Sequence, residues 1–162
     1  MSLRALARPA GLMTAGFYVA LFSAFGAHLP FWPLWLAEWG LSEAEAGALL
    51  GAAIVARLGA GTAGPWRADA TGRRRTALAL MTGLGAALFL AHLLADSRAA
   101  LVALTLLSAA SLAGAMPVGD ALAGAAARLH GFAYAQVRAL GSAAFLLAAL
   151  GCGWAVARWG AD

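Results

Sequence analysis

Long runs of apolar residues alternate with short polar segments along the whole chain. An α-helix needs about 20 mostly apolar residues to cross ~30 Å of hydrocarbon. The runs that meet this length cover residues 12–36, 46–66, 76–95, 99–119 and 135–157. The pattern therefore predicts an all-α fold, an integral membrane bundle of five transmembrane helices. We expect residues 1–162 to form a single transmembrane domain with no soluble domain.

The polar segments predict where the helices begin and end. Residues 38–43 link the first two helices, and Ser42 with Glu45 has the spacing of a capping box that opens the second helix. Residues 67–75 form the predicted second link and residues 96–98 the third. The longest predicted connection runs from residue 119 to residue 134.

Composition narrows the class of protein. Hydrophobic residues make up 63% of the chain and charged residues 11%, whereas a soluble domain carries about a quarter charged residues. The net charge is +4, but the 11 lysine and arginine residues are all arginines and lie mainly between apolar runs, so we expect no nucleic-acid partner. With Cys152 alone there is no disulfide framework or thiolate pair for a metal. Motifs of catalytic sites are missing too, so we expect no enzyme, no cofactor and no metal.

The arginines predict the orientation, because cytoplasmic loops of membrane proteins carry an excess of positive charge. An N-terminus in the cytoplasm leaves only Arg98 and Arg158 outside, together with the acidic residues of the first and third links. The cytoplasmic segments then hold Arg4, Arg8, Arg67, Arg73, Arg74, Arg75, Arg128 and Arg138. We expect a multi-pass protein of the cell inner membrane, whose partners include the lipid bilayer.

Arg57 lies near the middle of the second predicted span. An arginine at that depth costs about 2.5–3.5 kcal/mol on insertion scales, so it should face a partner or a hydrated cavity. It either lines a substrate path or forms a structural pair.

Asp120 ends the fourth predicted span and Arg138 opens the fifth, so antiparallel neighbours could bring the two charges together. Such a pair could bind a polar substrate or carry a proton, or it could be an interfacial salt bridge of little net value. Steps of three and four from Arg138 reach Ser142 and Phe145. A helix face that mixes a cation, a hydroxyl and a ring suggests the interior of the bundle.

Two further features carry titratable or charged groups. His28, beside an aromatic stripe on the first helix, could relay a proton or serve in packing. The charged residues of the second link could hold neighbouring helix ends in one conformation, or could simply be topogenic charges. These residues are Asp69, Gly72, Arg73, Arg74 and Arg75.

Residues 69–75, Asp-Ala-Thr-Gly-Arg-Arg-Arg, resemble the conserved loop between helices two and three of major facilitator superfamily transporters. Pro65 stands where the loop's first glycine would fall, and Ala70 replaces the basic residue after the aspartate. Segments 26–36 and 134–145 look like the lactose-permease-like branch, with the nearest likeness to the 3-phenylpropionate transporter group. Segments 55–57 and 117–123 also resemble that group.

The resemblance implies roles for individual residues. In the sugar-transporting relatives, an acid that ends helix four and an arginine in helix five bind substrate, and Asp120 and Arg138 match those positions. Phe145 takes the place of a sugar-stacking tryptophan and Ser142 that of a nearby cysteine, which weakens the case for a galactoside. Such transporters have twelve helices in two six-helix halves, so the chain resembles most of the N-terminal half. We expect a missing C-terminal half as a partner.

Two hypotheses for function follow. The first is the N-terminal portion of a secondary active transporter, a proton-coupled symporter for a small organic solute such as an aromatic acid. A sugar or nucleoside symporter is a weaker variant of it. The second hypothesis is a truncated non-transporting membrane protein or a helical partner subunit. The first implies a small-molecule substrate and protons as partners, with Arg57 and Arg138 placed to attract an anion.

Overall fold

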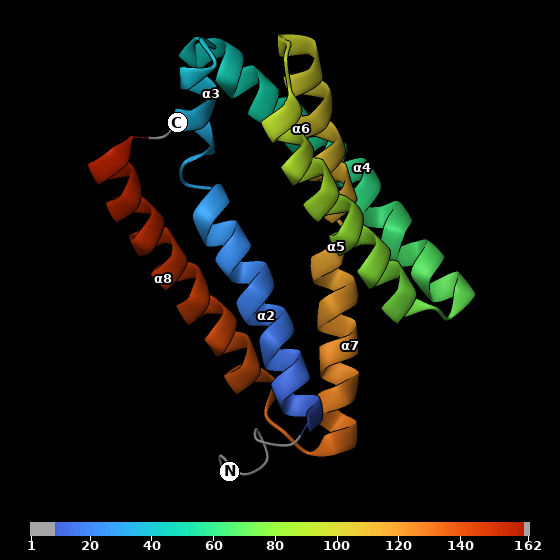
Figure 1. Ribbon diagram of the computed structural model, residues 1–162. Helices are drawn as coiled ribbons and strands as arrows, with labels where there is room; N and C mark the ends of the chain where they lie inside the picture. Colours follow the sequence, from blue (N-terminus) through green and yellow to red (C-terminus); the bar gives the residue numbers. More distant parts are fainter. Residues whose placement is uncertain (1–8, 161–162) are drawn as a thin grey trace. The chain divides into compact units, whose positions relative to one another are not determined.

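The computed structural model describes residues 9–160, and within this range the chain is helical without any strand (Figure 1). The prediction of an all-α fold is confirmed. The elements, in chain order, are α2 (Pro9–His28), α3 (Trp32–Glu38), α4 (Glu43–Thr71), α5 (Arg74–Ala91), the 3-10 helix η1 (His92–Leu94), α6 (Arg98–Leu112), α7 (Ala115–His130) and α8 (Tyr134–Trp159).

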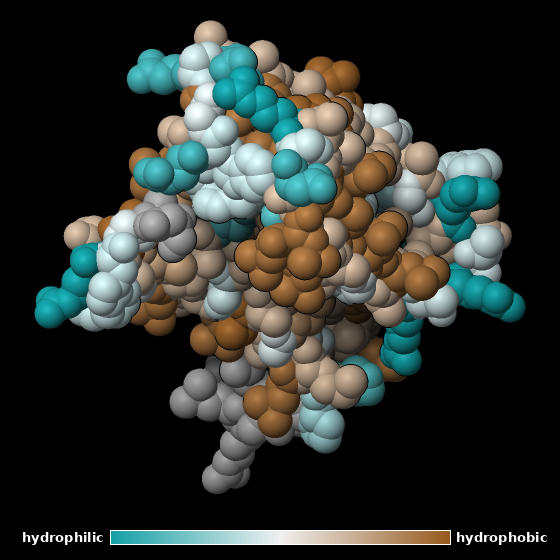
Figure 2. All heavy atoms as spheres, turned by 45° about the horizontal axis from the view of Figure 1, so that its top comes forward, coloured by the Kyte–Doolittle hydropathy of each residue, from teal (hydrophilic) through white to brown (hydrophobic). Residues whose placement is uncertain are grey.

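Five segments of this range are long and apolar enough to cross a membrane, as the apolar runs predicted. They are Pro9–His28, Glu43–Thr71, Arg74–Leu94, Arg98–His130 and Tyr134–Trp159. Many large apolar side chains on them are exposed, among them Leu58, Leu80, Leu93 and Leu147. Figure 2 shows hydrophobic residues, in brown, at the surface among more polar ones. Exposed apolar surface on this scale is expected where lipid replaces water as the surrounding solvent.

The first predicted helix, 12–36, is wrong in its continuity. The structure ends α2 at His28 and begins the short α3 at Trp32. Pro30 has no backbone N–H to donate, and Pro33 stands in the first turn of α3, where proline is tolerated. The two prolines therefore split the predicted helix into two.

The second helix is longer than predicted. The capping box forms as expected, since the Ser42 hydroxyl accepts from the Glu45 N–H and the Glu45 carboxylate accepts from the Ser42 N–H. Helix α4 then continues through Pro65 to Thr71, so the predicted link of residues 67–75 shrinks to two residues. Gly72, with φ of 65°, ends the helix in the left-handed conformation that glycine adopts without strain.

The connection predicted between residues 119 and 134 is also wrong. The chain breaks earlier, at residues 113–114, and α7 then runs to His130, which leaves only residues 131–133 as a link. Pro117 stands in the first turn of α7, so it does not interrupt the helix. The following alanine-rich segment has high helix propensity, so the helix continues across most of the predicted connection.

The chain divides into two compact units, and each is described by itself. The first contains residues up to Leu41 and from Ala123 onward. Here α2 packs along α8, as Figure 1 shows. Its core combines residues of α2, α7 and α8 with the link before α8, namely Ala15, Tyr18, Ala123, Ala127, Phe132 and Val137.

The second unit runs from Ser42 to Leu122, and in it α6 packs against both α4 and α5. Leu101 is fully buried, and three buried polar side chains lie at the contacts of α6. One of them, His92, has its Nδ1 2.8 Å from the Leu88 carbonyl oxygen and its Nε2 3.4 Å from the Thr105 hydroxyl. This histidine therefore joins the end of α5 to α6.

Candidate functional site

The clearest chemical arrangement in the first unit is a guanidinium over two aromatic rings. Arg138, in the first turns of α8, places its Cζ 4.3 Å from the ring centroid of Phe22 and 5.3 Å from that of Tyr18. Both distances are within the roughly 6 Å range of a cation–π contact. Tyr18 is fully buried and Arg138 is half-buried, so the charge is held at a fixed place beside α2.

Two glycines make this arrangement possible because they let α2 and α8 approach closely. A Cβ added to Gly26 would overlap the main-chain carbonyl of Phe145, and one added to Gly141 would lie 3.0 Å from the Cβ of Tyr18. Small residues at such crossings are common where helices pack in membranes. The backbones themselves therefore set the distance between Arg138 and the rings.

The predicted face of α8 is only partly turned toward α2. Gly141 is buried against Tyr18, and the main chain of Phe145 lies against Gly26. Ser142 is exposed. Its proposed role in substrate binding stays a prediction, as do the roles of the other site residues.

His28 is the last residue of α2, and its ring centroid lies 4.3 Å from that of Trp32. The aromatic contacts continue along α3, with Trp32 stacked 4.6 Å from Trp35, and Trp35 5.8 Å from Trp39. This series of rings bridges the break that Pro30 introduces. A packing role and a proton-relay role are both compatible with this position.

The two other predicted charges lie in the second unit. Asp120 is half-buried on α7, and its pairing with Arg138, which belongs to the first unit, stays a prediction. Arg57 is exposed near the middle of α4 and makes no hydrogen bond or ion pair within residues 9–160. In a membrane-spanning helix such a residue needs a hydrated or charged environment.

The structure brings together two residues of the predicted conformational loop. The Arg74 Nε donates to the Asp69 Oδ1 over 2.6 Å, across the two-residue link between α4 and α5. Asp69 stands near a helix C-terminus and Arg74 at a helix N-terminus, positions that the helix dipoles disfavour for these charges. The ion pair therefore offsets the unfavourable position of each charge. Arg73 and Arg75, the other arginines of this segment, are also exposed.

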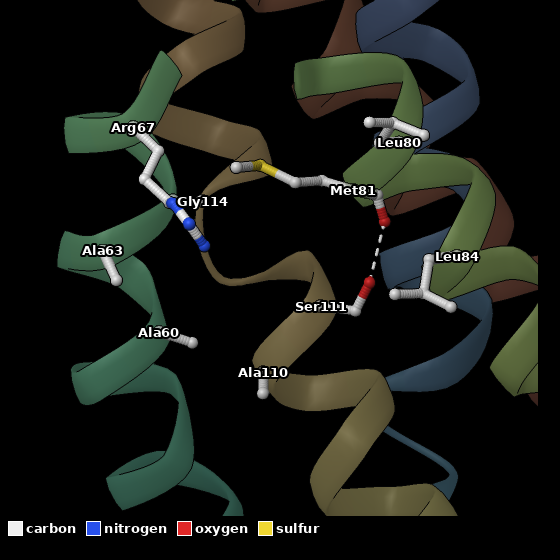
Figure 3. A pocket seen from close by; sticks show the side chains of 10 residues that line it. Ala60, Ala63, Arg67, Leu80, Met81, Leu84, Ala110, Ser111 and Gly114 are labelled. Carbon is white, nitrogen blue, oxygen red and sulfur yellow. Dashed lines mark hydrogen bonds between the residues drawn. The ribbon is translucent and has the colours of Figure 1, made fainter. Parts of the chain in front are cut away.

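A pocket in the second unit was not anticipated from the sequence. Its volume is about 310 Å³ and it lies among α4, α5 and α6 (Figure 3). Its polar lining residues are Arg67 and Ser111, and the Ser111 hydroxyl donates to the Met81 carbonyl over 3.0 Å. The spacing of Ala60, Ala63, Gly64 and Arg67 on one face of α4 was the signal that could have indicated it.

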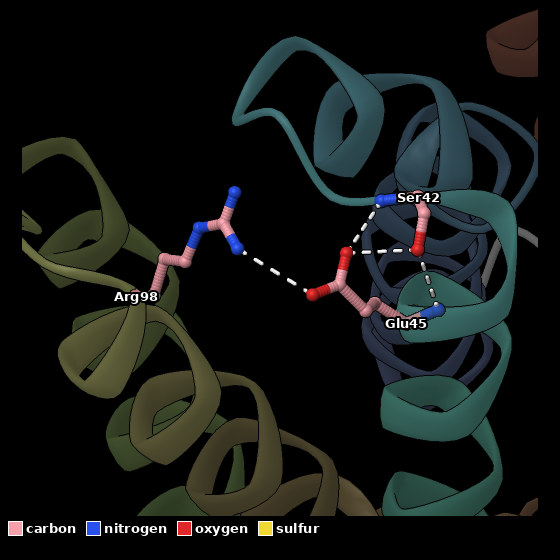
Figure 4. Close-up of polar contacts among 3 residues, drawn as sticks. All are labelled: Ser42, Glu45 and Arg98. Carbon is pink, nitrogen blue, oxygen red and sulfur yellow. Dashed lines mark hydrogen bonds and ion pairs between the residues drawn. The ribbon is translucent and has the colours of Figure 1, made fainter.

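A second feature that the sequence left unassigned lies where α4 and α6 begin. One oxygen of the Glu45 carboxylate accepts from Ser42 in the capping box, and the other lies 3.4 Å from an Nη of Arg98 (Figure 4). Both side chains are more than half exposed, so the ion pair adds little stability. Its effect is to tie the first turns of two helices together.

Comparison with known proteins gives one family. The sequence model of the MFS_1 like family matches residues 12–162. The chain belongs to the MFS_1 like family. No curated protein and no solved structure matched the chain.

Membership of the MFS_1 like family establishes an MFS-type protein and points to a transporter-related role. It agrees with the five apolar helices, which make this a multi-pass membrane protein. The match covers all the site residues discussed above. It does not distinguish among the branches or substrates of the family.

Proposed function

We propose that this chain is the N-terminal part of a secondary active transporter, a proton-coupled symporter that carries a small aromatic carboxylate across the inner membrane. The observation that carries the proposal is the Arg138 guanidinium held over Phe22 and Tyr18. It supplies a cation beside aromatic surface on a membrane-spanning helix. A second set of helices, proposed as the C-terminal half of the transporter, would complete the pathway.

The chemistry favours an anion with an aromatic part. A guanidinium carries five N–H donors, and a bidentate carboxylate occupies only two of them. Arginine is therefore suited to binding a carboxylate group. The rings of Phe22 and Phe25, whose centroids are 6.2 Å apart, offer edges and faces on which a substrate ring can pack.

The remaining candidate residues receive complementary roles. Arg57 would raise the positive potential of the path and so attract the anion. Asp120 and His28 are the titratable groups proposed to carry the coupled proton, and Ser142 and Phe145 would contact the substrate from α8. The N-terminus is placed in the cytoplasm, because the arginine-rich segments then fall on the cytoplasmic side.

Uptake of labelled 3-phenylpropionate and other aromatic carboxylates by cells that make the full-length protein tests the proposal. We expect Arg138→Ala to abolish uptake and Arg138→Lys to retain a small part of it, since lysine keeps the charge without the planar donors. The matched control is Arg158→Ala, which removes a second arginine of α8 that lies 5.8 Å from the ring of Trp154.

Membrane abundance of each variant must be measured beside uptake. Full uptake by Arg138→Ala at normal abundance would contradict the proposed site. A wild-type protein that moves none of the carboxylates, sugars or nucleosides tested would favour the alternative of a non-transporting membrane protein.

A further inference from the structure

The pocket of the second unit is open on one side and lined almost entirely by apolar groups. Alanine, glycine and leucine residues of α4, α5 and α6 form most of its wall. The Ser111 hydroxyl already donates its hydrogen to the Met81 carbonyl. The Arg67 side chain, exposed and without a hydrogen bond or ion pair in the described part of the chain, is therefore the group that decides what binds there.

Glycines and one methionine keep the pocket hollow. A Cβ on Gly64 would lie 2.5 Å from the Cε of Met81, and one on Gly114 would lie 3.0 Å from its Sδ. The Met81 side chain therefore packs directly onto the main chain at Gly64 and Gly114. Because a methionine side chain is flexible, the wall that it forms can adjust to an occupant.

The polarity of the pocket changes along α4. Ala60, Ala63, Gly64 and Arg67 follow one helix face, and Arg67 lies about 10 Å further along the axis than Ala60 at ~1.5 Å per residue. The helix ends four residues later, at Thr71. Apolar groups thus lie toward the middle of the span and the cation toward its end (Figure 3).

We propose that this pocket binds one anionic phospholipid, with an acyl chain against Ala60, Ala63 and Leu84 and its phosphate on Arg67. The order of apolar and cationic groups along α4 matches the order of chain and headgroup in a lipid leaflet. Arg73 and Arg75, beyond the end of α4, are exposed and do not line the pocket. Basic pockets between helices at this depth bind anionic headgroups.

Charge complementarity favours a lipid over a covering helix. A helix laid across the pocket would enclose the Arg67 guanidinium and would need an acidic side chain at that height. A lipid phosphate brings the opposite charge at the membrane–water boundary, where the pair stays partly hydrated. The lipid assignment does not depend on the transported solute, because none of the proposed substrate-binding residues lines the pocket.

Native mass spectrometry of the full-length protein, released from detergent with added lipid, tests whether the pocket binds an anionic phospholipid. The probes are dioleoyl phosphatidylglycerol, dioleoyl phosphatidylcholine and inorganic phosphate. Arg67→Gln removes the cation, with Arg75→Gln as the matched control from the same arginine-rich end. Ala63→Leu fills the pocket, with Ala52→Leu as a control at an exposed position of α4 that does not line it. Helical circular dichroism establishes that each variant is folded.

We expect the wild type to bind phosphatidylglycerol about fivefold more tightly than phosphatidylcholine. Arg67→Gln should abolish this preference, Ala63→Leu should weaken both lipids, and the two controls should behave as the wild type. Equal binding of the two lipids would overturn the proposal. So would an equal loss in Arg75→Gln, unchanged binding in Ala63→Leu, or displacement of the lipid by inorganic phosphate.

Discussion

At the scale of single residues, the position of Arg138 decides what the first unit can do. Sequence spacing places Arg138, Ser142 and Phe145 on one face of a helix. The structure packs Arg138 and the main chain of Phe145 against α2 and leaves Ser142 exposed. The rings beneath the guanidinium could not be assigned beforehand. Which residues of α2 meet Arg138 depends on how the two helices cross, and a single helix pattern does not encode that crossing.

Phe22→Leu is expected to raise the KM for the carboxylate about two- to tenfold, because it removes a cation–π contact of about 0.5–1.4 kcal/mol that positions Arg138. Uptake kinetics in cells that make each variant measure this KM. Phe17→Leu is the control, since the Phe17 ring lies on the same helix, 5.2 Å from that of Tyr18, and has no cation–π contact among the described residues. Equal KM values for the two variants would show that the rings do not position the guanidinium.

At the scale of elements, local chemistry explains which helix boundaries the sequence could predict. The Ser42–Glu45 capping box was predictable because both partners lie within one turn. The split at Pro30 was missed because the apolar run continues across it, although the prolines were visible. Helix α4 continues to Thr71 and α7 to His130 through charged and glycine residues, whose local pattern favours a link and does not encode the helix.

Two glycine substitutions in α2 should have opposite effects. Gly26→Ala drives a methyl group into the Phe145 carbonyl and should lower the free energy of unfolding by about 1–3 kcal/mol. Gly16→Ala, which meets nothing within 4 Å, should leave stability unchanged or raise it by up to about 1 kcal/mol. Thermal unfolding in detergent compares them, and similar melting temperatures would contradict the close packing of α2 on α8.

The two-residue link between α4 and α5 should depend more on Gly72 than on its ion pair. Asp69→Asn removes a half-exposed ion pair, so the expected loss of unfolding free energy is below about 1 kcal/mol. Gly72→Ala places a side chain at φ of 65°, which costs about 1–2 kcal/mol. Thermal unfolding measures the stability of both variants. A larger loss of stability in Asp69→Asn than in Gly72→Ala would mean that the ion pair holds the helix ends together.

At the scale of the whole molecule, the number of spans and the membrane class followed from length and hydropathy alone. The division into two compact units did not, because it arises from contacts between residues far apart in sequence, such as those of α2 with α8. The pocket among α4, α5 and α6 was hidden for the same reason. The family match agrees with the transporter class that the resemblance implied.

Cysteine labelling of intact cells tests the predicted orientation. In a Cys152→Ser background, Glu38→Cys should react with a membrane-impermeant maleimide from outside, because residue 38 belongs to the predicted outer link. Ala70→Cys, at the arginine-rich end of α4, should react only after permeabilisation. The reverse pattern would place the N-terminus outside and would contradict the arginine-based orientation.

The most direct measurement of the central claim is uptake of a labelled aromatic carboxylate into proteoliposomes that hold the full-length protein, with and without an imposed pH gradient. An acidic exterior should drive accumulation above the external concentration, and a protonophore should remove it. The Arg138→Ala variant should show no accumulation of the carboxylate, whereas Arg158→Ala should match the wild type. Uptake that merely equilibrates whatever the gradient, or accumulation that survives in Arg138→Ala, would contradict a proton-coupled symporter built around Arg138.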